Sequence, residues 1–355
     1  MRSSLVFLLT LISFFTAAQD SLGVRSDSLR PDTLTIIGVG DIMMGTNYPE
    51  NKLPPRDGVF LLQDVEDVLR DADVTFGNLE GVLLDSGGAP KTCKDPKVCY
   101  AFRTPVRYVQ NLMNAGFDLL SLANNHAGDM GDAGRRSSMA TLDSAGILHA
   151  GQLNQKTVVF EKDSVRYGLV AFSPNNNCVP LNDLGGAKAL VMHLDSIADI
   201  VIVSFHGGAE GAQHQSVPRA TELFYGENRG DVYKFSHALI DAGADIVFGH
   251  GPHVTRAVEV YNDRFIAYSL GNFCTYRGIS IAGVNGLAPI IKVYTDREGR
   301  FLKGAITPTQ QSYETGVRID PERKVIAKIR ELTKKDFPES RIQIDDNGLI
   351  TYLAQ

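Results

Sequence analysis

Short, almost wholly apolar runs alternate with amphipathic stretches from Thr33 onward, and this alternation constrains the fold more than any other feature of the sequence. The runs are rich in Val, Ile, Leu and Phe, which is typical of strands covered on both faces. They lie at 34–40, 74–78, 118–123, 167–173, 199–205, 245–249 and 264–270. The amphipathic stretches, which predict helices, lie at 61–71, 106–115, 133–145 and 232–242. Two of these end in Ala-Gly-x-Asp, where Gly suits a helix C-cap. The sequence therefore predicts a layered α/β domain.

The tail after Pro308 departs from this alternation. Asp320 followed by Pro321 predicts the start of a helix, because Asp favours the N-cap and Pro the first helical position. The last segment, IQIDDNGLITYL, predicts a hairpin with an Asp-Asn-Gly turn. We therefore expect one domain over residues 33–306 and a C-terminal extension over residues 307–355 that packs on it.

The balance of charged and hydrophobic residues excludes several classes of protein. Hydrophobic residues make up 43% of the chain and charged residues 21%, which excludes a disordered chain and a membrane protein with several spans. The formal net charge is −6, so no large basic excess is available to neutralise phosphates. No nucleic-acid partner is therefore expected.

The N-terminal residues have the order of regions found in a secretory signal peptide. Arg2 supplies the positive start, an almost wholly apolar run follows, and Thr16-Ala17-Ala18 precede Gln19 as a cleavage site. The apolar run is shorter than the roughly 20 residues of a membrane span. We predict a signal peptide over residues 1–18, a polar linker over residues 19–32, and an exported protein that is periplasmic or secreted. An uncleaved N-terminal anchor is the alternative.

Export to an oxidising compartment would allow a disulfide. Cys93 and Cys99 lie six residues apart in a polar loop, CKDPKVC, and a local bridge between them is the favoured pairing, which the sequence leaves open. Cys178 and Cys274 are expected to lie in loops as free thiols. None of the four has the Cys-x-x-Cys spacing of a metal site.

Polar side chains follow five of the predicted strands at their C-terminal ends, the edge at which open α/β sheets bind ligands. They are Asp41, Asn78 with Glu80, Asn124-Asn125-His126 with Asp129, His206, and His250 with His253. Each alone could cap a turn or hydrogen-bond within a loop. Together they form a mixed oxygen and nitrogen set that suits one or two divalent ions, Mn, Fe, Zn or Mg. Two such ions could activate a water for attack on a phosphoryl centre.

Six sequence blocks resemble, in the same order, those of the CapA family, the poly-γ-glutamate capsule-biosynthesis proteins that share the calcineurin-like metallophosphoesterase fold. The blocks are GVGDIMMG (38–45), FGNLEGVL (76–83), SLANNHAGDMG (121–131), SFHGGAE (204–210), GADIVFGHGPHV (243–254) and AYSLGNF (267–273). The resemblance implies a layered α/β fold, a metallophosphoesterase-like β-sandwich flanked by helices. It also implies a metal site at the C-terminal ends of the strands.

The resemblance implies a role for each residue of the site. The implied metal ligands are Asp41, Glu80 as the usual bridging acid, Asn125, His206, His250 and His253. His126 is implied as the general acid or as a stabiliser of the transition state. Asp129 and Glu210 are candidate acceptors for the outer nitrogen of an imidazole. From their places at strand ends, Asn78 and Asn272 are candidates for the pocket lining or for holding the ligands, and Asn272 could equally cap a turn.

One position departs from the first block of ordinary metallophosphatases, which reads Asp-x-His. Met43 stands where that His would be, and a thioether is a poor ligand for hard divalent ions. The site is therefore short of one ligand, which leaves open whether one or two ions bind.

Two functions remain open from the sequence. The first is an exported CapA-like protein of capsule or poly-γ-glutamate biosynthesis with a metal-dependent, phosphoesterase-type hydrolase site, acting on a phosphate ester or an anionic polymer. The second is a non-hydrolytic component of exopolymer assembly that binds or transfers the polymer with the same fold. The resemblance also implies membrane-bound capsule-synthesis subunits as partners.

Overall fold

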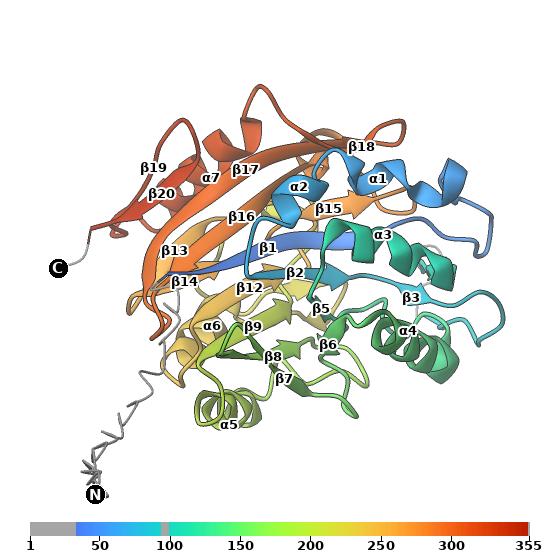
Figure 1. Cartoon of the computed structure of the whole chain (residues 1–355), viewed down its shortest axis with the longest axis horizontal. Helices are drawn as coiled ribbons and strands as arrows, with labels where there is room; N and C mark the ends of the chain where they lie inside the picture. Colours follow the sequence, from blue (N-terminus) through green and yellow to red (C-terminus); the bar gives the residue numbers. More distant parts are fainter. Residues whose placement is uncertain (1–32, 94–98, 354–355) are drawn as a thin grey trace, which may run out of the picture. The chain divides into compact units, whose positions relative to one another are not determined.

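Two β-sheets packed face to face form the core of the protein (Figure 1). They are described from a computed structural model, which covers residues 33–93 and 99–353. The predicted signal peptide (1–18) and linker (19–32) lie outside the described residues. Within the described ranges, no helix combines the length and the apolar character that a membrane span requires.

The first sheet has ten strands in the order β19-β20-β17-β16-β1-β2-β5-β6, with β15 paired to β1 and β18 paired to β17. Its strands are β1 (Leu34–Met43), β2 (Val74–Leu79), β5 (Leu119–Ser121), β6 (Leu148–Ala150), β15 (Asn272–Thr275), β16 (Leu287–Thr295), β17 (Phe301–Ser312), β18 (Gly316–Ile319), β19 (Ile342–Ile344) and β20 (Leu349–Tyr352). Strands β1, β2, β5 and β6 run parallel, so their C-terminal ends share one edge.

The second sheet has six strands in the order β13-β14-β12-β9-β8-β7. They are β7 (Thr157–Lys162), β8 (Val165–Phe172), β9 (Ile200–His206), β12 (Ile246–His250), β13 (Val258–Tyr261) and β14 (Arg264–Ala267). Strands β8, β9, β12 and β14 run parallel. Two further pairs, β3 (Val82–Leu83) with β4 (Arg103–Thr104) and β10 (Leu223–Phe224) with β11 (Glu227–Asn228), stand apart from both sheets.

All but the last of the helices cover the outer faces of the two sheets, whereas buried residues of the last one join the core that the two sheets share. The helices are α1 (Phe60–Gln63), α2 (Glu66–Leu69), α3 (Val109–Ala115), α4 (Gly131–Ala145), α5 (Leu184–Asp195), α6 (Val232–Ile240) and α7 (Lys324–Asp336). Buried residues of α1 to α4 pack on the first sheet, and those of α5 and α6 pack on the second. Between the sheets, the rings of Phe76 and Phe248 stack with centroids 5.6 Å apart. The predicted layered α/β sandwich flanked by helices is confirmed.

All seven predicted strands are present. Among the helices, one prediction is wrong and one helix was not predicted. The predicted helix 61–71 is wrong as a single helix, because α1 and α2 are separated at Asp64 and Val65. Asp64 is held from outside this segment by an ion pair with Arg318 at 2.9 Å. The sequence does not predict α5, since Gly185 and Gly186 in its first turn weaken the helical pattern.

Both predicted glycine C-caps are confirmed. Helix α3 ends at Gly116 in the left-handed conformation (φ 80°), as predicted. The second glycine, Gly243, also has a positive φ (109°) and follows α6, whose last helical residue is Ile240. The N–H groups of Gly243 and Ala244 donate to the carbonyls of Ile240 and Leu239, each at 3.0 Å, which is the Schellman pattern of a glycine C-cap.

The C-terminal residues contribute to the first sheet. Helix α7 begins at Lys324, not at Pro321, because Arg323 is left-handed (φ 56°) and interrupts the helical turn. Asp320 still caps this start, since its carboxylate accepts from the Lys324 N–H at 2.8 Å. The predicted hairpin is confirmed as β19 and β20. Strand β17 (Phe301–Ser312) runs across the expected boundary between residues 306 and 307.

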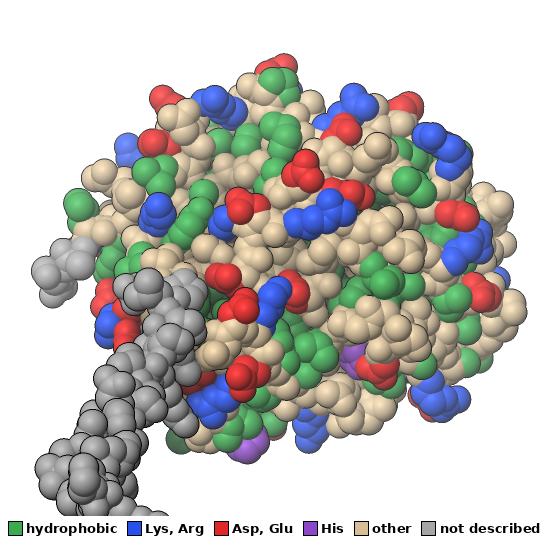
Figure 2. Space-filling model, viewed as in Figure 1, with side chains coloured by type: hydrophobic (Ala, Val, Ile, Leu, Met, Phe, Trp, Pro, Cys, Tyr) green, Lys and Arg blue, Asp and Glu red, His purple; other side chains and the backbone are tan. Residues whose placement is uncertain are grey.

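Charged side chains on the face drawn in Figure 2 are interspersed, with acidic and basic groups side by side. A continuous basic track of the kind that binds a polyanion is therefore not a property of this face, as far as the described residues show.

Cys93 and Cys99 form a disulfide, with Cα atoms 5.6 Å apart, which confirms the favoured pairing. Cys178 and Cys274 are free and buried. The expectation that Cys274 lies in a loop is wrong, because it belongs to β15, where it pairs with Ile42 of β1.

Removing this disulfide is expected to destabilise the protein moderately. A bridge that closes so short a loop restricts the unfolded chain by about 2 kcal/mol. The double variant Cys93→Ala, Cys99→Ala should therefore unfold in urea with a free energy lower by about that amount. A reducing agent should shift the wild type by a similar amount and leave the double variant unchanged. An equal shift of both proteins would contradict the prediction.

Candidate metal centre

The polar strand ends meet at one edge of the sandwich. On the first sheet, Asp41 of β1 lies in register with Asn78 of β2 and with Asn272 of β15. On the second sheet, His206 and His250 end β9 and β12 and lie opposite each other. The two groups come close, since the Asn78 amide nitrogen is 3.5 Å from His206 Nδ1.

Asp41, Glu80 and His253 form the centre of the site. One potential ligand atom from each lies within 4.8 Å of the others, a spacing that could hold a metal ion. His253 Nδ1 is 3.1 Å from Asp41 Oδ2, and His253 Nε2 is 3.6 Å from Glu80 Oε1. His206 adds a second imidazole, with Nε2 3.8 Å from the same Glu80 oxygen. All four residues are buried.

Several buried ligand atoms at this site have no hydrogen-bond partner among the described residues. They include both carboxylate oxygens of Glu80, Asn125 Oδ1 and His206 Nε2. A buried polar atom left unpaired costs about 1–3 kcal/mol, so native proteins keep few of them without a reason. Carboxylate, amide and imidazole groups are ligands that divalent Mn, Fe, Zn and Mg accept. The residues present therefore fit a divalent cation.

Neighbouring amides hold these side chains in place. Asn124 donates to Asn78 Oδ1 at 3.0 Å, and Asn78 in turn donates to Asp41 Oδ1 at 2.8 Å. Asn272 Oδ1 lies 2.9 Å from His253 Nδ1, so Nε2 is the ring nitrogen left for a cation. The backbone of His253 is left-handed (φ 57°), a strained conformation that clusters at functional sites.

Burial and nearby charges shift the proton affinities of the site in different directions. Burial raises the pKa of Glu80 well above its ordinary value. Burial also lowers the pKa of His206 well below its ordinary value, and Arg229 lowers it further. For His253, burial alone would lower the pKa, but the carboxylates of Glu80 and Asp41 raise it to about 10. A proton on His253 thus balances the carboxylates when no cation is bound.

His250 is directed away from this centre. Its Nε2 is 3.0 Å from the carbonyl oxygen of Val39, and its Nδ1 is 3.4 Å from Ser204 Oγ. Both ring nitrogens therefore have partners in the sandwich, and the structure does not bring this implied ligand into the group formed by Asp41, Glu80 and His253.

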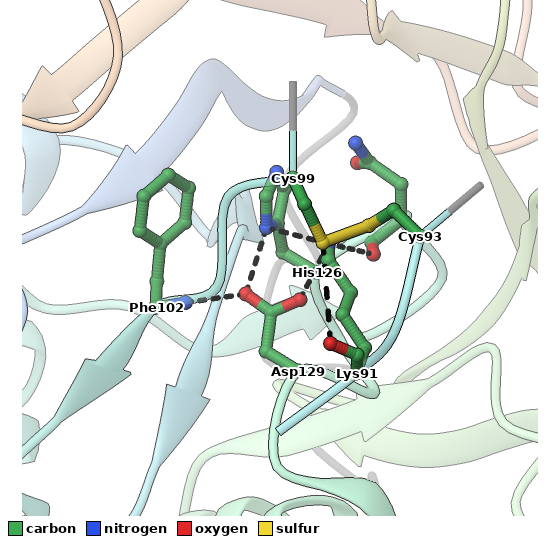
Figure 3. Close-up of a disulfide and its surroundings, with 7 residues drawn as sticks. Lys91, Cys93, Cys99, Phe102, His126 and Asp129 are labelled. Carbon is green, nitrogen blue, oxygen red and sulfur yellow. Dashed lines mark hydrogen bonds and ion pairs between the residues drawn. A yellow bond between two sulfur atoms is a disulfide. The ribbon is translucent and has the colours of Figure 1, made fainter. Parts of the chain in front are cut away.

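His126 is held by a buried acid, as Figure 3 shows. Its Nδ1 lies 2.7 Å from Asp129 Oδ2, and its ring stacks on Phe102 with centroids 4.3 Å apart. The Phe102 N–H donates to the same Asp129 oxygen at 2.5 Å. Burial lowers the pKa of His126, which favours a neutral ring near pH 7. With Nδ1 engaged, Nε2 is the nitrogen that can exchange a proton.

Glu210 has a partner other than a histidine. Its Oε1 pairs with Arg229 at 3.0 Å, and this buried arginine also donates to the Gly208 carbonyl at 3.0 Å. Sequence reasoning missed Arg229 and also Lys91, whose Nζ lies 2.6 Å from Asp129 Oδ1. No local pattern marks an isolated cation in a polar loop, so only the folded structure reveals these two contacts.

The family of the chain is shown by its sequence. The family "Bacterial capsule synthesis protein PGA_cap" matches residues 35–277, so the chain belongs to that family. This confirms the resemblance to CapA proteins. The chain is 29% identical over 269 residues to the capsule biosynthesis protein CapA of Bacillus anthracis, covering 70% of this chain and 61% of that protein. It is 28% identical over 291 residues to the PGA biosynthesis protein CapA of Bacillus subtilis (strain 168), covering 77% and 71%.

The chain thus spans less than two thirds of the Bacillus anthracis protein. Among solved structures, it overlaps a hypothetical protein from Thermus thermophilus with a TM-score of 0.46 and 19% identity, covering 81% of this chain and 100% of that chain. It overlaps a 5'-nucleotidase precursor from the same organism with a TM-score of 0.44 and 13% identity, covering 88% and 60%.

Proposed function

We propose that this chain is a metal-dependent, phosphoesterase-type hydrolase of capsule or poly-γ-glutamate biosynthesis. The observation that carries the proposal is the set of unpaired, buried ligand atoms of Glu80, Asn125 and His206 beside the Asp41–His253 pair. Atoms of this chemistry suit a divalent cation. Membership of the PGA_cap family and the relatives named for capsule and PGA biosynthesis support the biological process.

The residues divide the chemistry between two sides of the site. Asp41, Glu80, His206 and His253, with Asn125, would hold the cation, which when bound supplies Lewis-acid polarisation of a phosphoryl oxygen and activation of a water. On the other side, Asp129 engages Nδ1 of His126 and Phe102 covers the ring. The free Nε2 would then exchange a proton with the reacting oxygen atoms.

The test is metal analysis of the purified full chain after exposure to Mn, Fe, Zn or Mg, followed by a screen of phosphate esters and γ-glutamyl polymers. We expect stoichiometric metal and turnover of at least one phosphate ester.

His206→Ala should abolish turnover. His126→Ala should lower kcat by about 10²–10⁴-fold while bound metal is retained, because it removes a proton-transfer group and no predicted ligand. His193→Ala, an exposed position on α5, is the control.

The outcomes separate the two functions left open by the sequence. Turnover that survives His206→Ala counts against the assignment of the site. Bound metal without turnover, together with binding of a γ-glutamyl polymer, would favour a polymer-binding or transfer component. No metal under any loading condition would overturn both the hydrolase and metal-assisted transfer.

We also propose that the protein is exported, on the basis of Arg2, the apolar run after it and the small residues before Gln19. The Cys93–Cys99 disulfide supports this, because disulfides persist in oxidising compartments. N-terminal sequencing of protein recovered outside the cytoplasm should begin at Gln19. Recovery of the chain only in the cytoplasm with its N-terminus intact would overturn the proposal.

A further inference from the structure

A lysine lies at the centre of the contacts that hold His126 (Figure 3). Lys91 Nζ is 2.6 Å from Asp129 Oδ1, 3.0 Å from the carbonyl oxygen of Asn125 and 3.3 Å from His126 Nδ1. Its backbone N–H also donates to the Asp129 carbonyl at 2.8 Å. One residue thus contacts the acid, the implied ligand and the proton-transfer group.

The donors and acceptors at this point allow one arrangement of protons. An ammonium can only donate, and an ionised carboxylate can only accept. The His126 Nδ1 must therefore carry the proton in its 2.7 Å contact with Asp129 Oδ2. Lys91 then forms an ion pair with the other carboxylate oxygen and donates to the Asn125 carbonyl. Its 3.3 Å approach to Nδ1 follows from sharing the same acid.

The Asp129 carboxylate is fully buried, whereas the Lys91 side chain is 23% exposed. A buried carboxylate with one oxygen free could rotate and present either oxygen to the ring. The Lys91 ammonium engages Oδ1 and so leaves Oδ2 to His126 and to the Phe102 N–H. The same ammonium donates a charge-assisted hydrogen bond to the Asn125 carbonyl, and such bonds are stronger than neutral ones, which suits them to fixing a geometry.

We infer that Lys91 is a positioning residue for the proposed phosphoester hydrolysis: by clamping Asp129 and the Asn125 carbonyl, it fixes the orientation and tautomer of the His126 imidazole. This inference rests on the proposed function for its kinetic consequence, but its structural consequence can be measured without turnover. The disulfide loop supports the position of Lys91, since Cys99 Sγ lies 3.9 Å from the Lys91 carbonyl oxygen.

The kinetic test compares Lys91→Met with Lys91→Arg, and uses Lys188→Met on the exposed face of α5 as the control. Lys91→Met should lower kcat by about 10-fold to 100-fold, less than loss of the histidine itself, with KM and bound metal close to wild type. Lys91→Arg should restore kcat to within about 3-fold of wild type, because a guanidinium can donate to the same acceptors. In a His126→Ala background, Lys91→Met should change kcat by less than about 2-fold.

A purely structural role would give a different result. Lys91→Met would then lower kcat by the same factor with and without His126, and this additivity would overturn the inference.

The second measurement is nitrogen-15 NMR of histidine-labelled protein, with the His126 signals identified by their loss in His126→Ala. The wild type should show His126 protonated at Nδ1, and Lys91→Met should broaden or remove this N–H signal by faster exchange with water. An unchanged Nδ1–H signal in Lys91→Met, or a wild-type ring protonated only at Nε2, would overturn the role of Lys91. If the wild type turns over no phosphate ester, the proposed function fails alone and the NMR result still decides for or against Lys91.

Discussion

Replacing Glu80 with glutamine is expected to abolish stoichiometric metal binding and, at the same time, to stabilise the metal-free protein. Glu80 is fully buried, and none of the described residues donates a hydrogen bond to either of its oxygens. Burial raises the pKa of this carboxyl well above its ordinary range, which means that the ionised form is costly in the folded protein. An amide of the same shape carries no charge, so most of this cost disappears.

The size of the gain follows from the cost of an unsatisfied buried group, about 1–3 kcal/mol. For a domain of this size, even the lower end of that range should raise the Tm of metal-free protein by about 2 °C at a pH high enough to ionise the wild-type carboxyl. Calorimetry of both proteins after chelation measures the shift, and metal analysis measures the loss of binding. Glu314→Gln, at an exposed position, is the matched control.

The opposite signs of the two effects make this prediction informative. A structural carboxylate would lose stability on conversion to the amide, because its partners would lose a charge-assisted bond. A Glu80→Gln protein that still binds one metal ion per chain would show that Glu80 is not a cation ligand. One that is less stable without metal would contradict the stability prediction and show that pairing with His253 outweighs the cost of burying the carboxylate.

The strands of the two sheets were predictable, whereas their assembly was not. Near-continuous apolar runs such as those of β1, β9 and β12 are buried on both faces, so their composition alone identifies them. In the antiparallel half of the first sheet, β16 pairs with β1, which lies far away in the sequence, and β17 pairs in turn with β16. No local pattern specifies such pairing. Similarly, the break between α1 and α2 coincides with a distant contact, the ion pair of Asp64 with Arg318.

At the site, residue type and position at a strand end predicted which side chains would gather, but not where each would point. Asp41 and Asn78 meet because register places them opposite each other in neighbouring parallel strands. The direction of the His250 ring depends on its contact with the carbonyl of Val39, which belongs to the opposite sheet. Glu210 likewise pairs with Arg229 from a loop that precedes α6. These side-chain contacts depend on residues that only the fold brings close, so the sequence alone does not predict them.

Stability should fall with rising pH in the metal-free protein, and an added divalent cation should oppose that fall. Burial alone would lower the pKa of His253, but Glu80 and Asp41 raise it to about 10, above the ordinary value of 6.5. A base whose pKa is raised by folding contributes stability that is complete below pH 6.5 and is lost as pH rises towards 10. The raised pKa of Glu80 acts in the same direction, because the folded protein retains a proton that the unfolded chain releases.

A cation reverses the dependence because it takes the place of these protons. Ligands bind metal in their deprotonated forms, so affinity rises with pH. At a free concentration 100 times the Kd, binding adds about 2.7 kcal/mol to the free energy of unfolding. Urea unfolding between about pH 6.5 and pH 9, with and without metal, should therefore give two curves that diverge as pH rises.

His253→Gln should flatten the metal-free curve, whereas His193→Gln at an exposed position should not. Parallel curves would mean that protons and cation do not compete for the same atoms, and the assignment of Asp41, Glu80 and His253 as one metal centre would then be wrong.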